Sequence, residues 1–175
     1  MRILQKLTLD TDADAAWRAL HSPTVLAEMY GPFVVVTPLD QTEAQVVASE
    51  LDPRESVAVQ LRLLGRFPIG RQLISVSERV EEHRGATVRI LRDSGIPLTG
   101  PLAGLDVWDH QMAVSPAPGD SSRTLWRERL VIGGPGAALL WPSLWLIWQW
   151  RARRIRSLAR TWAHDPESPA SPASL

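Results

Sequence analysis

The residues best suited to chemistry are His110 and Glu128, which lie in two neighbouring predicted strands. Each side chain would be costly to bury alone, and a hydrogen bond between them would offset much of that cost. A nearby carboxylate favours protonated histidine while burial opposes it, so the pair could hold a proton near neutral pH. His110 and Glu128 are therefore a candidate general acid and base for a carbonyl or hydroxyl substrate, a candidate anchor for a ligand head group, or a structural pair.

The strands that carry this pair are predicted at 106–115 and 123–132, on either side of the loop 116–122. Pairing Val114 with Thr124 puts His110 opposite Glu128. The same register matches Met112 with Trp126, Trp108 with Leu130, Gln111 with Arg127 and Asp109 with Arg129. One face of the hairpin is then aromatic with one polar pair, and the other is charged and complementary. A slip of one residue would oppose apolar and polar side chains, so we expect this register.

The segment from Ala137 to about Ala163 is predicted to form a long helix with one broad aromatic face. At helical spacing its apolar stripe consists of Trp141, Trp145, Trp148, Ala152, Ile155, Ala159 and Trp162. The residues expected away from the stripe are Leu146, Ile147, Trp150, Arg151, Arg153, Arg154 and Arg160. A helix of this kind needs a broad apolar surface to pack against, and we expect a curved antiparallel sheet to supply it.

This segment also raises the question of a membrane helix, because the chain carries no charge between Arg129 and Arg151. A transmembrane helix needs about 20 apolar residues. However, the glycines and proline at 133–136 break the run, and Leu130–Ile132 reads better as the end of a strand. We therefore favour a buried helix over one that spans or lies on a membrane.

The remaining elements follow from local patterns. An alternating segment predicts a first strand at 2–9, and two short helices follow it. Thr11 and Asp14 have the spacing of a capping box, and Ser22 with Pro23 begins the second helix. Further strands are predicted at 33–38, 44–51, 57–63, 71–82 and 86–93, and a loop at 94–105. The Pro-, Ala- and Ser-rich tail 164–175 is expected to be disordered.

Composition excludes several classes of protein. Nineteen basic and nineteen acidic residues among 175 give no overall electrostatic attraction to nucleic acid. The absence of cysteine excludes disulfides, thiolate chemistry and Cys-type zinc sites. The four histidines have no metal-ligand spacing, and no phosphate loop or nucleophile elbow occurs. The N-terminal segment lacks the apolar core of a signal peptide, so we expect a cytoplasmic protein without metal or cofactor.

A strand, two short helices, a strand meander and a long C-terminal helix are similar in order to the START-like, or SRPBCC, helix-grip fold. The segment 12–20, which carries Trp17, resembles the first helix of that superfamily, and 22–29 resembles the second. The Trp-Asp-His-Gln-Met segment 108–112 and the Trp- and Arg-rich final helix resemble its bacterial cyclase/dehydrase-like members. The resemblance implies one α+β domain over 1–163, in which about seven strands wrap the C-terminal helix around a cavity.

The superfamily includes carriers, cyclases, hydrolases and chaperone-like binders, so the resemblance does not fix one chemistry. We expect a protein that binds a hydrophobic or aromatic, lipid- or polyketide-like molecule, with His110 and Glu128 fixing its polar group. The expected pocket wall is Trp108, Met112, Trp126, Trp141, Trp145 and Trp148. Two alternatives stay open: an aromatase/cyclase- or dehydrase-type enzyme that uses His110 and Glu128, and a membrane-peripheral protein. The sequence leaves open whether exposed aromatic side chains drive homodimer formation.

Overall fold

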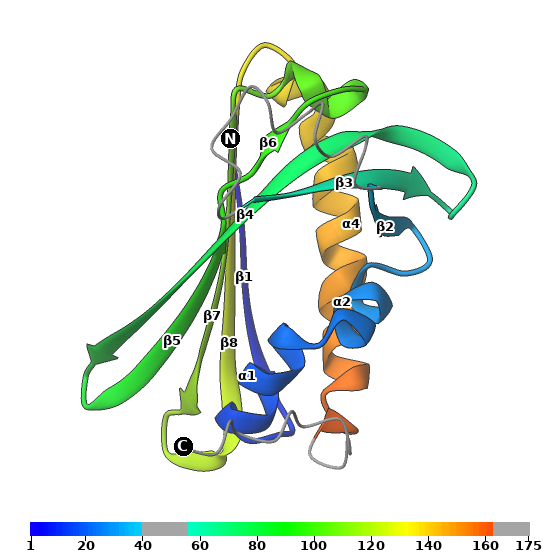
Figure 1. Cartoon of the computed structure of the whole chain (residues 1–175). Coiled ribbons are helices and arrows are strands. Elements are labelled where there is room, and N and C mark those ends of the chain that lie inside the picture. The colour runs from blue at the N-terminus through cyan, green and yellow to red at the C-terminus, as the bar shows by residue number, and fades with distance from the viewer. Residues whose placement is uncertain (40–55, 163–175) are drawn as a thin grey trace, which may run out of the picture.

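The computed structural model describes residues 1–39 and 56–162, where a curved antiparallel sheet wraps around one long helix (Figure 1). The strand order is β1-β8-β7-β5-β4-β3-β2, and the short β6 pairs with β4. The strands are β1 Arg2–Leu9, β2 Val34–Pro38, β3 Ser56–Leu63, β4 Phe67–His83, β5 Ala86–Asp93, β6 Ile96–Pro97, β7 Val107–Ala117 and β8 Asp120–Gly133. The helices are α1 Ala13–His21, α2 Pro23–Tyr30, the 3₁₀ helix η1 Pro101–Gly104, and α4 Ala137–Leu158.

The predicted helix-grip architecture is confirmed: two short helices follow β1, and α4 is the long C-terminal helix. The strand predicted at 44–51 and the tail 164–175 lie outside the described residues. The loop predicted at 94–105 contains two short elements, β6 and η1. In the described part of the chain, no helix is long and apolar enough to cross a membrane.

The 17-residue strand β4 produces much of the sheet's curvature. Its second half, Val76–His83, pairs with β5, while its first half, Phe67–Ser75, pairs with β3. Strand β4 therefore connects the part of the sheet that contains β5 with the part that contains β2 and β3. Figure 1 shows it crossing from the β5 side to α4. As a result, β2, β3 and the first half of β4 form a wall over the N-terminal half of α4.

The first helix is capped differently from the prediction. Asp12, and not Thr11, is the N-cap of α1, because its side chain accepts a hydrogen bond from the Ala15 backbone N–H at 2.8 Å. The predicted start of α2 is confirmed, since the Ser22 hydroxyl accepts from the Val25 N–H, with Pro23 at the first helical position. Both caps use a short polar side chain to satisfy N–H groups that have no partner inside the helix.

The β7–β8 hairpin is formed as predicted, but its register differs by two residues. Val114 lies opposite Trp126 rather than Thr124, and His110 lies opposite Leu130 rather than Glu128. The strands continue to a tight turn at Pro118–Gly119, where Gly119 adopts a φ of 81°, so the expected long loop does not exist. A shift of two residues keeps every side chain on its predicted face, which is why the alternation of the sequence could not exclude it.

The orientation of α4 is correct in its second half and wrong in its first. Trp148, Ala152, Ile155, Ala159 and Trp162 are buried as predicted. However, Trp145 is 41% exposed, and Leu144 is buried in its place. Arg151, expected to face solvent, is completely buried. The first half of α4 is apolar on several faces, so its sequence did not specify which face packs against the sheet.

The core consists of two hydrophobic clusters. The first joins α1, α2, the inner face of the sheet and the C-terminal half of α4, with Trp126 and Ile155 among its buried members. The second joins the start of β1, the ends of β7 and β8 and the N-terminal half of α4, with Leu130 and Trp148 among its members. Glu128 lies on β8 between Trp126 and Leu130, so its buried carboxylate sits where the two clusters meet.

Candidate functional site

A cavity of about 220 Å³ lies between α4 and the wall formed by β2, β3 and β4. Its lining is mostly apolar and includes Val34, Leu61, Ile69, Leu102, Leu144 and Ile147. Four polar side chains also line it: Tyr30, Gln72, Asp93 and Ser143. A mostly apolar hollow with a few polar groups is typical of a site for a small hydrophobic ligand.

The loop 94–105 closes one end of this cavity because it is held tightly against β4. The Leu98 N–H donates to the Arg71 carbonyl at 2.8 Å, and the Arg71 N–H donates to the Thr99 hydroxyl at 2.9 Å. At Gly100, whose φ is 77°, a Cβ atom would lie 2.0 Å from the Ile69 carbonyl oxygen. Glycine is therefore required there. This close approach brings Leu102 of η1 to the cavity wall.

Asp93, at the end of β5, is the acidic group on the cavity wall. Its Oδ2 accepts a hydrogen bond from Trp108 Nε1 at 3.1 Å, and its Oδ1 accepts one from the Gly95 N–H at 3.0 Å. Burial raises the pKa of Asp93 above its usual value, although these two hydrogen bonds act in the opposite direction. The carboxyl group is thus held in place by N–H donors at a site where its charge is costly.

Next to the cavity, Glu128 and Arg151 form a completely buried ion pair. Trp126 Nε1 donates a second hydrogen bond to Glu128 Oε1 at 2.8 Å. The Arg151 guanidinium also lies 4.6 Å from the centre of the Tyr30 ring, in cation–π geometry. These contacts join α2, β8 and α4, so the pair has a clear structural role.

The pair also determines the charge states of its members. Burial alone would raise the pKa of Glu128, but the positive charge of Arg151, with help from His110 and Trp126, lowers it to about 2. Glu128 is therefore ionised at neutral pH. Burial raises the pKa of Tyr30 more than the Arg151 charge lowers it, so the phenol keeps its proton. The positive charge of Arg151 is thus balanced by Glu128.

His110 lies between two carboxyl groups, the buried Glu128 and the partly buried Asp93. It is directly opposite Asp93 in the β5–β7 pairing, and its Nε2 lies 3.9 Å from Glu128 Oε2 on the other side. Neither of these two atoms has a hydrogen-bond partner within the described residues. The ring packs edge-on against Trp148, with 5.2 Å between centroids. His110 and Glu128 are therefore neighbours as predicted, but they are related diagonally across the strands and not directly.

Comparison with solved structures places the whole arrangement among known folds. The aromatase/cyclase Zhui from Streptomyces sp. R1128 matches with a TM-score of 0.55 at 11% identity, over 96% of this chain and 98% of its own. Norcoclaurine synthase from Thalictrum flavum, solved with dopamine and hydroxybenzaldehyde, matches with a TM-score of 0.55 at 13% identity, over 95% and 89%. The chain shares the helix-grip fold of these two structures. No protein-family model and no curated protein sequence matches it.

Only part of the predicted site faces the cavity of this helix-grip fold. Trp108 and Trp148 line it. Met112, Trp126, His110 and Glu128 are buried beside it in the core and do not belong to its lining. Trp141 is partly buried against the second cluster, and Trp145 is exposed on the outer side of α4. The predicted aromatic wall therefore reduces to two tryptophans, and aliphatic and polar side chains together with Tyr30 supply the rest.

Sequence reasoning missed Asp93 and Arg151. Asp93 is the last residue of a predicted strand, directly before Ser94 and Gly95, where an aspartate is typical of a turn. Arg151 stands among several arginines, which suggested a solvent-exposed face. One signal was available: Arg151 follows Trp148 by three residues and precedes Ile155 by four, which puts it beside the buried stripe.

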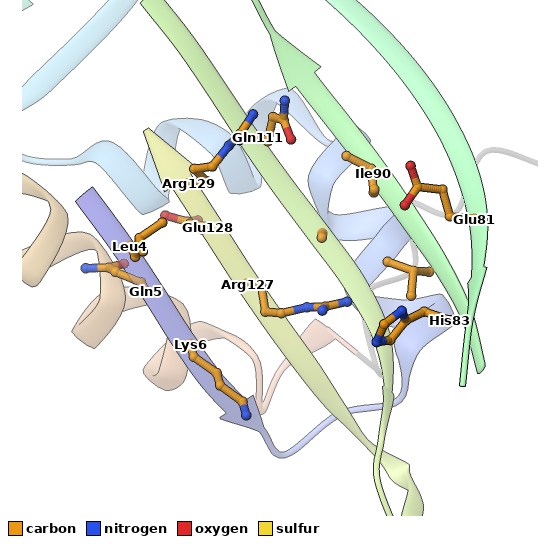
Figure 2. Close-up of a pocket in the computed structure, with 12 residues that line it drawn as sticks. Leu4, Gln5, Lys6, Glu81, His83, Ile90, Gln111, Arg127, Glu128 and Arg129 are labelled. Carbon is orange, nitrogen blue, oxygen red and sulfur yellow. The ribbon is translucent and has the colours of Figure 1, made fainter. Parts of the chain in front are cut away.

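A second hollow, of about 410 Å³, lies on the outer face of the sheet (Figure 2). It exists because Ala113, a small residue, lies between Arg127 and Ile90 in the strand pairing. Figure 2 shows Arg127 extending across the sheet toward His83. The hollow is open and charged side chains surround it, so the cavity beneath α4 is the better candidate for an apolar ligand.

Proposed function

We propose that this protein binds a hydrophobic or aromatic small molecule, lipid- or polyketide-like, in the cavity between the sheet and α4. The observation that carries the proposal is the mostly apolar cavity of about 220 Å³ beneath an intact helix-grip fold. A two-ring aromatic molecule is of comparable size. The fold shared with an aromatase/cyclase and with a synthase solved with two aromatic compounds supports this proposal.

The test compares two substitutions at adjacent positions of α4. Ile147 lines the cavity, whereas its neighbour Leu146 is 62% exposed. Ile147→Trp should fill the cavity and weaken the binding of 2-naphthol at least tenfold in isothermal titration calorimetry. Leu146→Trp adds the same side chain outside the cavity and should bind as the wild type does. Equal binding by both variants would show that the probe binds elsewhere.

Native mass spectrometry of the purified protein provides the complementary measurement. We expect a co-purifying apolar molecule in the wild type, and a smaller amount of it in Ile147→Trp. Identification of that molecule would also define the substrate for the alternative described next.

The second candidate function is proton-transfer catalysis on a bound molecule by His110, although its ring is buried beside the cavity and outside the lining. Its Nε2 has no hydrogen-bond partner among the described residues, and two carboxyl groups flank the ring. Because Glu128 stays ionised at neutral pH, it would act as a fixed negative charge beside His110 and would not exchange a proton itself. An enzyme of this kind should retain ligand affinity but lose conversion of the co-purifying molecule in His110→Ala. Unchanged conversion in that variant would exclude the role.

The hypothesis of a lipid-inserting helix receives less support from the structure. The apolar residues off the stripe, Leu146, Ile147 and Trp150, are the ones expected to insert into lipid; Leu146 is exposed, but Ile147 lines the cavity. Trp150 is partly buried: its Nε1 donates to the Gly31 carbonyl at 3.0 Å, and its ring packs edge-on against Phe33. Exposed apolar side chains on α4 are Leu139, Trp145 and Leu146, so only part of the expected lipid-facing set is available for membrane binding. We therefore retain ligand binding as the proposed function.

A further inference from the structure

We infer that Asp93 selects the ligand by its head group: the cavity takes hydrophobic molecules that donate a hydrogen bond, such as phenols and alcohols, and rejects carboxylates. This inference rests on the proposed function of the cavity and adds the chemical class of its ligand. It also moves the polar anchor from His110 and Glu128, which lie outside the lining, to a residue that the sequence did not single out.

The geometry leaves part of the Asp93 carboxylate available to a ligand. Two N–H donors, from Trp108 and Gly95, hold one oxygen each. A carboxylate has about four acceptor positions, so acceptor capacity remains on a group that lines the cavity. The Trp108 contact also fixes the orientation of the carboxylate, because the indole is itself part of the same wall.

The charge of Asp93 explains why its remaining acceptor positions should favour a ligand that donates a hydrogen bond. Arg151 is engaged by the ion pair with Glu128, so its charge is already balanced. Asp93 therefore places a carboxylate in a mostly apolar wall, opposite His110 on β7. A ligand hydroxyl can satisfy that carboxylate, whereas a ligand carboxylate would bring a like charge next to it and lose its own hydration.

The other polar groups of the cavity do not discriminate in this way. Tyr30, Gln72 and Ser143 can each donate or accept a hydrogen bond, so they suit a ligand of either kind. Asp93 can only accept a hydrogen bond when its carboxyl group is ionised, which requires a pH above its raised pKa. Asp93 is thus the lining residue whose chemistry distinguishes a ligand that donates a hydrogen bond from one that only accepts. The preference of the cavity for donating ligands should depend on Asp93 alone.

The experiment uses three probes with the same two-ring body. 2-Naphthol donates a hydrogen bond, 2-methoxynaphthalene accepts but does not donate, and 2-naphthoate carries a negative charge. Titration calorimetry at pH 8 should show that the wild type binds 2-naphthol about tenfold or more tightly than 2-methoxynaphthalene, as expected for a hydrogen bond to a charged group. Binding of 2-naphthoate should be weaker still.

Two variants test whether Asp93 causes this order. Asp93→Asn keeps the size of the side chain and removes its charge, so the affinity ratio of 2-naphthol to 2-methoxynaphthalene should fall to about two or less. Ser143→Ala removes a different polar lining group and should leave the ratio unchanged. If Asp93→Asn does not fold, the order of the three probes in the wild type decides the question by itself.

The outcomes separate this inference from the proposed function. Equal wild-type affinity for 2-naphthol and 2-methoxynaphthalene, or tightest binding of 2-naphthoate, overturns the selection by Asp93. If Ile147→Trp still abolishes binding in that case, the cavity remains the ligand site. A wild type that binds none of the three probes overturns both proposals.

Discussion

The substitution Arg151→Met tests the buried ion pair most directly. Both side chains of the pair have 0% exposure, and the pKa of Glu128 is lowered from 4.5 to about 2. One pKa unit corresponds to about 1.4 kcal/mol, so the ionised Glu128 contributes about 3 kcal/mol to the free energy of unfolding at neutral pH. Removing one partner of a buried pair typically costs about 3–5 kcal/mol, because the other charge stays buried. We expect a loss of that order.

The pH dependence of stability should also change sign. In the wild type the folded-state pKa of Glu128 lies below the unfolded value, so its contribution is present above pH 4.5 and is lost as the pH falls toward 2. In Arg151→Met, burial would act on Glu128 without the opposing guanidinium and would raise its pKa above the unfolded value. That variant should therefore lose stability as the pH rises above about 4.5.

Urea denaturation at pH 5 and pH 7, followed by tryptophan fluorescence, measures both effects. Arg153→Met is the matched control, because Arg153 is exposed on the same helix, and its effect should stay within about 0.5 kcal/mol. The double variant Arg151→Met/Glu128→Gln removes both charges and should recover part of the lost stability. If Arg151→Met unfolds at the same urea concentration as Arg153→Met at both pH values, the reasoning is refuted.

Three further substitutions test other parts of the structure by urea denaturation. Trp148→Ala should cost about 3–5 kcal/mol and weaken 2-naphthol binding, whereas the exposed Trp145→Ala should change neither greatly; equal effects would contradict the orientation of α4. Asp12→Ala should cost about 1 kcal/mol through loss of the α1 cap, and no loss would restore Thr11 as the cap. Gly100→Ala should cost more than about 1 kcal/mol, because φ is 77° and a carbonyl is too close; wild-type stability would disprove that packing.

Local sequence patterns predicted most of the fold. Alternation identified β1 and β7, and Ser22 with Pro23 marked the start of α2, because each pattern reflects a constraint within a few residues. The apolar stripe in the C-terminal half of α4 was also predicted correctly, although Arg151 of the same half is buried and not exposed as expected. In these segments, apart from Arg151, the local preference and the final packing agree.

The sequence could not specify how distant elements meet. The predicted register of β7 and β8 is wrong by two residues. The sequence shows which side chains share a face of the sheet, and this assignment is identical in both registers. The environment of Arg151 depends on Glu128 from another element, and burial of an arginine is tolerated only with such a partner. Asp93 reaches the cavity because β4 and the loop 94–105 enclose it, and these are contacts between segments that no local pattern encodes.

The division of the core into two clusters has a consequence for how a ligand would enter and leave the cavity. The part of α4 from Ala152 onward packs with α1 and the inner face of the sheet. Leu144 and Ile147 of the same helix, together with η1, cover the cavity. If the cavity binds a ligand as proposed, we expect its exchange to loosen the turns of α4 before Ala152 while the later turns stay packed. The N-terminal half of α4 would then move to open the cavity, and the C-terminal half would hold the helix in place.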